Sequence, residues 1–570
     1  MVGILSILAL LFIVNKFASF YLENIIKENL ETKNPSLSGI TYSLEIEDWN
    51  IDLVRGNLQA KNISLKPLKT ISHSALNDDT AAYILDITIS SVKFTGLRYH
   101  FLSQKKVTCD GLNIDGICCE IKHYPKDKED TSTKKIETNP YHLIEPYLEE
   151  LNVKKLKTSN GQLQYFRFEK SDTMQFTLNN LSLQADRFSI NKDWQRGIKK
   201  TLLCDNIKLE LEKFSHSLPD EDYTFHCESA SINTSDSSLR IEGLHIEPVH
   251  SKMDFARLSS KNSDWSELKL EEIKLIGIHY HKNIIESVFF ADSVYINRLE
   301  YQNFKNQNVA SIRKLSSILY KSLQRAPVKM GIDRIRVDNS SVVYEELPRA
   351  KNEAGIIKFT DINANISNLT NIASENTINI LAQGKFMDMG LIDAEFNFPT
   401  NSLTDIFSIK GTLGGMNLIG INDIIEPLVS CRIENGQLHR VDFDIVGSDD
   451  SAYIDMLVLY SKLEVVLLKS INNKNYPQRF VSGFLNKLLL PQDNPTEGCS
   501  IQTVRRVTYR NKYSSTFNYL WKIVFGGLCE TIGLSEQKQQ YLQNLAKEVK
   551  EIKENTEKIK QKKNAIGKRR

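Results

Sequence analysis

The chain has 570 residues, of which 41% are hydrophobic and 25% are charged, so it is long enough for several units with cores of their own and is not a disordered protein. Its 72 basic and 70 acidic side chains leave a net charge of +2, which gives no general attraction for nucleic acid and predicts no DNA or RNA partner. The 8 cysteines include no CxxC pair and are too few for a disulfide-rich scaffold, so we expect most of them to be small buried side chains.

The N-terminal segment predicts a membrane anchor. The apolar run from Val2 to Val14 is extended by Phe17–Leu22 to about the 20 residues that a bilayer core requires. A secretory signal would carry small residues before its cleavage site, where Lys16 and Phe17 stand. We therefore predict a single-pass anchor over residues 1–22, with a cleaved signal as the alternative, and expect the rest of the chain to be extracytoplasmic.

The body of the chain is predicted to be β-sheet. A charged helix over residues 23–31 ends before Asn34-Pro35, and apolar residues then alternate with polar ones at 44–53 and 58–65 around a turn at 55–57. The same alternation returns at 85–89, 112–114, 268–275 and 441–445. Residues 125–140 are rich in charged and small polar side chains and are predicted to be a linker or loop.

An internal repeat organises the middle of the chain. The pattern from Val153 to Tyr165, with Asn160-Gly161 at its centre, recurs 179 positions later from Ile332 to Tyr344. A second pattern, over 176–188, recurs at 357–369 after an insertion of two residues. A short helix is expected before each copy, at 141–151 and 315–325, so the predicted unit is helix, strand, Asn-containing turn, strand, loop and strand.

A half-apolar sheet needs something to cover its apolar face. The expected fold is mainly β: an elongated, repeated antiparallel sheet forming a groove or a rolled half-barrel, with an N-terminal membrane helix and C-terminal helices. Either the sheet closes over its own side chains, or it leaves an apolar groove suited to acyl chains. The candidate lipid-groove residues are Leu163, Tyr165, Val342 and Tyr344.

The C-terminal region predicts two helices. An apolar stripe at helical spacing could contact a membrane or a partner protein, or cap one end of the β body; its candidate contact residues are Phe517, Leu520, Trp521, Val524 and Phe525. Beyond Gly533, apolar residues from 542 to 559 alternate at three and four positions, which predicts a coiled coil or a docking helix. The basic end, 558–570, favours anionic lipid or an acidic partner, with a solvated tail as the alternative.

No pattern of side chains predicts catalysis. His279 and His281 could share a strand face as metal ligands, but surface histidines explain them better. The acid pairs Glu345-Glu346 and Asp449-Asp450 follow turns or strand ends and are expected in solvated loops. No nucleotide-binding, hydrolase or metalloprotease motif occurs in a credible setting, so we expect a non-enzymatic protein without metal or cofactor.

A family resemblance covers both ends of the chain. The stretch 409–469 resembles the C-terminal part of AsmA-like envelope proteins, and its matching positions are Asn422, Pro427, Gly436, Leu438, Gly447, Tyr460 and Leu463. A glycine usual near Ile454 or Asp455 is missing. Segments 482–498 and 515–533 look like the tail of the Bacteroidetes branch of this family, and 56–67 is similar to its N-terminal unit.

The resemblance implies a protein anchored in the inner membrane, with its bulk in the periplasm, related to the repeating β-groove lipid carriers that maintain the outer membrane. Membrane lipids would be the cargo, and an envelope protein could bind the C-terminal helix. A structural scaffold or assembly factor without lipid cargo is the main alternative. A secreted glycoprotein is a third, because Asn62-Ile-Ser64 and Asn233-Thr-Ser235 are glycosylation triplets.

These patterns divide the chain into seven segments. They are a transmembrane anchor (1–22), an N-terminal helix and β unit (23–124), a polar linker (125–140), two helix-plus-β repeats (141–312 and 313–400), an AsmA-like C-terminal β unit (401–512), and an amphipathic helix with a basic heptad helix (513–570).

Overall fold

The computed structural model describes residues 36–37, 40–52, 54–68, 82–98, 105–124, 141, 149–168, 173–192, 203–217, 222–259, 264–280, 288–309, 315–372, 377–400, 405–429, 431–471, 474–477 and 491–532. It separates into unit 1, residues 1–301 and 328–336, and unit 2, residues 302–327 and 337–570. The predicted anchor, the linker at 125–140 and the heptad helix lie outside the described residues. Within those residues, no helix has the length and apolarity that crossing a membrane demands.

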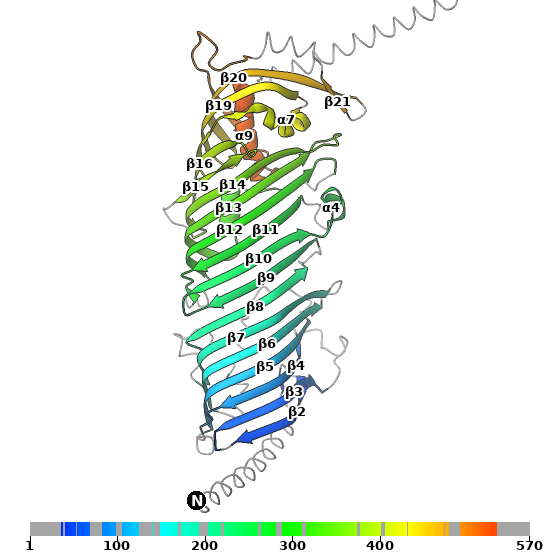
Figure 1. The fold of residues 1–570 in the computed structure, drawn as a ribbon, viewed down its shortest axis with the longest axis vertical. Helices are drawn as coiled ribbons and strands as arrows, with labels where there is room; N and C mark the ends of the chain where they lie inside the picture. Colours follow the sequence, from blue (N-terminus) through cyan, green and yellow to red (C-terminus); the bar gives the residue numbers. More distant parts are fainter. Residues whose placement is uncertain are drawn as a thin grey trace, which may run out of the picture. The chain divides into compact units, whose positions relative to one another are not determined.

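Unit 1 is built from strands that follow one another in sequence (Figure 1). They are β1 (Ser36–Leu37), β2 (Ile40–Asp52), β3 (Asn57–Pro67), β4 (Ala82–Thr95), β5 (Lys106–Tyr124), β6 (Glu150–Phe168), β7 (Thr173–Asn191), β8 (Asn206–Ser217), β9 (Tyr223–Asn233), β10 (Ser238–Pro248) and β11 (Trp265–Ile276), with helix α4 (Lys252–Leu258). The residues of β12 (Val288–Asn306) and β13 (Lys329–Leu347) are divided between the two units.

Each strand from β2 to β11 pairs with its neighbours in sequence. The hairpin predicted around 55–57 is confirmed as β2 and β3. All of these pairs are antiparallel except β5 with β6, which run parallel, so the expectation of a purely antiparallel sheet is wrong. A parallel pair needs a crossover of a dozen or more residues, and the chain between Tyr124 and Glu150 is long enough to provide one.

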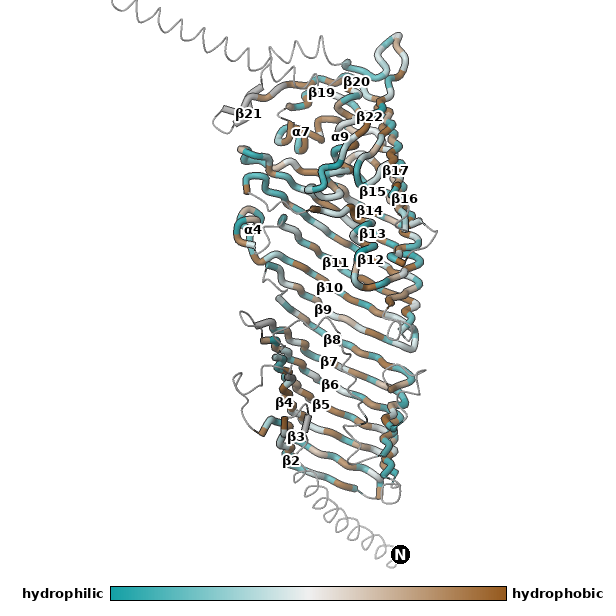
Figure 2. The backbone as a smooth tube through the Cα atoms, turned by 180° about the vertical axis from the view of Figure 1, so that it is seen from behind, coloured by the Kyte–Doolittle hydropathy of each residue, from teal (hydrophilic) through white to brown (hydrophobic). Residues whose placement is uncertain are grey.

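Several strands of unit 1 carry a residue with left-handed backbone near their middle. Its φ is 51° at Asn62, 54° at Asn160, 51° at Asn180, 52° at Lys213 and 60° at Gly243. Asparagine and glycine tolerate this conformation best. At Asn180 the pairing register of β7 shifts against both β6 and β8, as at a β-bulge, which interrupts the side-chain alternation there. Apolar and polar positions alternate along these strands in Figure 2.

The predicted repeat is visible in the backbone, but its predicted turn is wrong. Strands β6 and β13 have 19 residues each, and their bounds differ by 179 at both ends, from 150 to 329 and from 168 to 347. Asn160 and Asn339 occupy equivalent positions and are both left-handed, with φ of 54° and 53°. Both lie inside continuous strands and not in turns, because β5 pairs with β6 on both sides of Asn160 and β13 runs unbroken past Asn339.

Unit 2 adds β14 (Gly355–Thr370), β15 (Thr377–Phe386), β16 (Gly390–Pro399), β17 (Phe407–Leu413), β18 (Met416–Asn417), β19 (Cys431–Gly447), β20 (Ser451–Ile471), β21 (Lys474–Pro477) and β22 (Thr503–Tyr509). The antiparallel order is β14, β15, β16, β17, β19, β20, β22; β18 also pairs with β19, and β21 with β20. Its helices are α6 (Leu319–Gln324), 3₁₀ helix η2 (Leu418–Ile421), α7 (Asn422–Val429) and α9 (Thr516–Thr531). The helices predicted at 315–325 and at 517–528 are therefore present.

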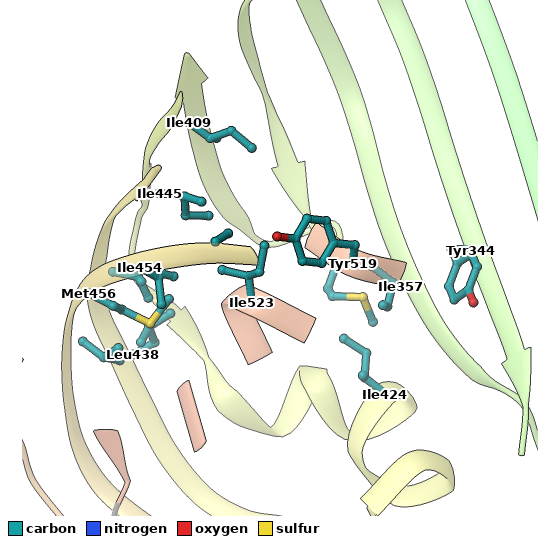
Figure 3. Packing of buried hydrophobic residues seen from close by; sticks show 14 of the residues in the cluster. Tyr344, Ile357, Ile409, Ile424, Leu438, Ile445, Ile454, Met456, Tyr519 and Ile523 are labelled. Atoms are coloured by element: carbon teal, nitrogen blue, oxygen red, sulfur yellow. The ribbon is translucent and has the colours of Figure 1, made fainter. Parts of the chain in front are cut away.

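The main core of the described residues lies in unit 2. Figure 3 shows Tyr519 and Ile523 of α9 gathered with Ile454 and Met456 of β20. Ile523 and Ile454 are both 0% exposed. The fold is thus mainly β, as expected, with an open sheet in each unit, since no described pairing joins the first strand of either unit to its last.

Candidate functional site

A continuous row of side chains crosses one face of unit 1, and it is almost entirely apolar. Each member pairs in register with the next, so all of them share one face of the sheet. This central row runs from β2 to β11 as Trp49, Ala60, Val92, Ile114, Thr158, Leu183, Leu209, Ile232, Leu239 and Leu275. At about 4.8 Å between strands it spans about 43 Å.

The one hydroxyl in the central row is already engaged. Thr158 lies beside the bulge of β6, and its Oγ1 accepts a hydrogen bond of 2.9 Å from the backbone N–H of Leu183. The hydroxyl replaces a ladder bond that the bulge interrupts, which leaves the central row without a free polar group at this position.

The opposite face of the same strands is polar. One residue away from the central row, a second register of paired residues consists of Asn50, Gln59, Lys93, Asn113, Lys157, Gln184, Lys208, Asn233 and Ser238. Lys93, Lys157 and Lys208 are exposed. The sheet therefore has one polar face suited to solvent and one apolar face.

The candidate groove residues of unit 1 lie on the apolar face. Leu163 pairs with Cys119 of β5 and Leu178 of β7, and it is half-buried. Tyr165 belongs to an aromatic row: its ring stacks on Phe176 at 5.0 Å, and its hydroxyl lies 2.7 Å from Nδ1 of His123. Burial, with a smaller effect of Arg167, lowers the pKa of His123, so the imidazole beside the face is kept neutral.

Little of the described structure covers this face in unit 1. The only helix there whose bounds are described is α4, which packs against β11, where Lys252 lies 4.9 Å from the ring centre of Trp265. Most members of the central row are half-buried, shielded by their neighbours in the sheet. A contiguous apolar surface of this extent ordinarily marks an interaction or ligand site.

In unit 2 the apolar face is covered by α9. The predicted stripe of Phe517, Leu520, Trp521, Val524 and Phe525 is half-buried and lines a cavity that residues of this sheet also line. The candidate groove residue Tyr344 is buried under this helix: its ring lies 4.6 Å from that of Phe517, and its hydroxyl donates to Glu346 at 2.6 Å. Sequence reasoning proposed one groove for Leu163, Tyr165, Val342 and Tyr344, whereas the structure puts the first two and the last two in different settings.

A cavity of about 510 Å³ lies between α9 and the sheet of unit 2. Val342 lines it, together with residues of β14 to β20, α7 and α9. Its lining side chains with N–H, O–H or S–H groups are Tyr460, Trp521, Cys431 and Cys529. The hydroxyl of Tyr460 donates to the carbonyl of Pro491 at 3.2 Å. Burial raises the pKa of Cys431 to about 11 and that of Cys529 to about 12, so both thiols are neutral.

A buried ionic cluster fixes the segment that leads into α9. Arg510, whose side chain is 0% exposed, pairs with Asp449 and donates through Nη2 to the carbonyl of Ser316 at 2.6 Å. Lys321 of α6 lies 2.9 Å from Asp405 and 3.2 Å from Asp449. The cluster joins four separate segments of unit 2, at 316–321, 405, 449 and 510, beside the start of α9.

Tyr320 completes this cluster, and α9 begins with a capped end. The hydroxyl of Tyr320 donates to Asp405, and burial together with this hydrogen bond raises the pKa of Tyr320. Ser515 caps α9 by accepting from the N–H of Asn518 at 3.2 Å, and the Thr516 hydroxyl accepts from the N–H of Leu319 at 3.0 Å. The helix is therefore held at its N-terminus as well as along its apolar side.

The residues that carry the family resemblance have structural roles. The side chain of Asn422 accepts from the N–H of Ile433 at 2.8 Å and donates to its carbonyl at 2.9 Å, which ties α7 to β19. Pro427 and Leu438 are buried, and Gly436 adopts φ of 154°. None of these side chains makes a chemical site.

Two predictions about charged side chains are wrong. His279 follows the end of β11 at Ile276, so it is not on a strand; it pairs with Asp292 at 3.1 Å. The acid pairs were expected in solvated loops: Glu346 is instead buried in β13, and Asp449 lies in the loop after β19 with only 16% of its side chain exposed, whereas Asp450 is 73% exposed as expected. Arg510, the partner of Asp449, is 61 residues away in the sequence, so no local pattern could have indicated the ionic cluster.

Among the described residues, no three His, Cys, Asp or Glu side chains come together as possible metal ligands. In comparisons with known proteins, no family model matches the chain and no curated protein matches it.

Proposed function

We propose that this protein handles membrane lipid, with acyl chains lying against the apolar face of unit 1. The observation that carries the proposal is the central row, which continues through ten paired strands while the opposite face is polar. Acyl chains are the common biological ligand that is both long and uniformly apolar. Each methylene taken out of water contributes about 0.8 kcal/mol, so a chain that covers part of this face binds without any specific contact.

The setting of this activity follows from the N-terminal sequence and the family resemblance. The apolar segment 1–22 would hold the protein in the inner membrane, and the resemblance to AsmA-like proteins implies a β body in the periplasm that helps to maintain the outer membrane. A groove formed by the apolar face would let lipid move from strand to strand along the central row. A role in the envelope that uses the same face to bind protein, without lipid, is the competing proposal.

The test compares two pairs of substitutions in the same two strands. Leu183 and Leu209 face each other in the central row, and Gln184 and Lys208 face each other on the polar side. Leu183→Glu with Leu209→Glu, and the control Gln184→Glu with Lys208→Gln, both change the net charge by −2. The full chain is purified in each form, and its bound lipid is measured by mass spectrometry.

We expect the wild type and the control to retain phospholipid and the central-row variant to lose at least half of it. Circular dichroism and the melting temperature show whether the variants fold. Equal lipid in the two folded variants, or none in the wild type, contradicts lipid handling by this face and favours the scaffold alternative.

A further inference from the structure

We propose that unit 2 contains a second binding site, in which the cavity under α9 holds one aliphatic chain. At about 510 Å³, the cavity is far larger than the voids of a close-packed protein interior. It falls within the range of sites that enclose small ligands. All of its lining residues belong to unit 2, so the site is formed without any residue of unit 1 and does not depend on the proposed function.

The lining selects the chemistry of the occupant. It contains no charged side chain, and the Tyr460 hydroxyl is already engaged with Pro491. A buried water needs two to four polar partners, which this lining does not supply. A polar or ionic ligand would lose its own hydration without compensation. A hydrocarbon chain has no such requirement, and its carboxylate or headgroup would remain outside the cavity.

Helix α9 forms one wall of the cavity, and this wall is fixed before any ligand binds. Tyr519 and Ile523 are 2% and 0% exposed and pack the helix onto the sheet, while Trp521 and Val524 line the cavity. The ionic cluster of Arg510 holds the chain just before the helix. Because the wall is fixed by contacts that do not involve the cavity, a bound chain pays little ordering cost.

The native tryptophans allow each site to be observed separately. The chain has 4 tryptophans, of which Trp521 lines the cavity and Trp49 lies in the central row of unit 1. Full-length protein that keeps only Trp521, with Trp49, Trp194 and Trp265 replaced by Phe, is titrated with dibromostearate, whose bromines quench fluorescence on contact. A second arm uses vesicles of brominated phosphatidylcholine. The same titrations are made on protein that keeps only Trp49.

We expect dibromostearate to quench Trp521 and the titration to saturate at one chain per protein. Val524→Phe, which fills the cavity from α9, should weaken this binding about tenfold or more. Lys522→Phe, at an exposed position of the same helix, should leave it unchanged. The melting temperature of both variants is measured, so that a loss of binding caused by unfolding is recognised.

The two titrations distinguish a free fatty acid from a membrane lipid as the occupant, and the two single-tryptophan proteins distinguish this site from the face proposed in unit 1. Quenching of Trp521 by vesicles alone identifies the occupant as an acyl chain of a lipid, and quenching by dibromostearate identifies a free fatty acid as sufficient. An unquenched Trp521, or equal binding by the Val524→Phe and Lys522→Phe proteins, overturns the site. Quenching of Trp49 with a silent Trp521 overturns it while leaving the proposed function of unit 1 in place.

Discussion

Replacing Arg510 by Met tests whether the buried ionic cluster holds α9 in place. The guanidinium is fully buried, pairs with Asp449 and donates to the Ser316 carbonyl at 2.6 Å. Its removal leaves the Asp449 side chain, 16% exposed, with Lys321 as its remaining ion-pair partner among the described contacts. Breaking a buried pair by deleting one partner costs about 3–5 kcal/mol, and we expect Arg510→Met to lie in this range.

The assay is urea unfolding followed by the fluorescence of Trp521 in the protein that keeps only this tryptophan, because Trp521 reports on unit 2. Arg505→Met is the matched control: Arg505 precedes Arg510 by five residues and pairs with Asp455 at 3.1 Å, but its side chain is 72% exposed. A solvent-exposed pair contributes about 0–1 kcal/mol, so the control should be nearly neutral.

A double-mutant cycle isolates the interaction. Asp449→Asn removes the carboxylate that Arg510→Met leaves with Lys321 alone, so the double variant should lose less stability than the sum of the two single variants, with a coupling of about 1–3 kcal/mol. A cost for Arg510→Met that equals that of Arg505→Met, or strict additivity in the cycle, refutes the role assigned to the cluster.

Three further predictions concern other parts of the fold, each read by urea unfolding. Asn160→Ala should cost about 1–2 kcal/mol because Asn160 is left-handed with φ of 54°, while Asn160→Gly should be tolerated; equal costs argue against the bulge. Asn422→Ala should cost about 1–3 kcal/mol because both backbone groups of Ile433 lose their partner, and an unchanged midpoint rejects this role. Burial lowers the pKa of His123 in the folded protein. The stability linked to the neutral imidazole is therefore complete above pH 6.5 and is lost as the pH falls through the lower pKa of the folded state. His123→Gln should reduce this loss of stability in acid, and a pH profile identical to that of the wild type contradicts the prediction.

The apolar alternation predicted the strands well because a half-buried sheet imposes a period of two on its sequence. It could not distinguish a bulge from a turn. Asn160-Gly161 has the composition of a two-residue hairpin turn. The same two residues also suit a bulge inside a strand, so the sequence is compatible with both structures. The pairing of β5 with β6 on both sides of Asn160 shows that the strand continues through this residue, which excludes a hairpin turn. The equivalent Asn339 was misread for the same reason.

Long-range features were beyond the reach of sequence reasoning. The parallel pairing of β5 with β6 depends on where the chain returns after residues 125–149, which no local pattern encodes. The stripe on α9 was recognised, but its spacing is the same whether the helix caps a sheet or lies on a membrane. The cavity is likewise invisible in the sequence, which gives the apolar residues without the way in which their volumes fill the space.

Site-resolved crosslinking tests the central claim most directly. A photoreactive amino acid is placed at Leu183, in the central row, or at its neighbour Gln184, on the polar face, in the full chain expressed in a host with a double-membrane envelope. The account predicts that, after irradiation, phospholipid is attached to the protein labelled at 183 and not to the protein labelled at 184. Lipid attached equally at both positions, or protein adducts in place of lipid at 183, would contradict it.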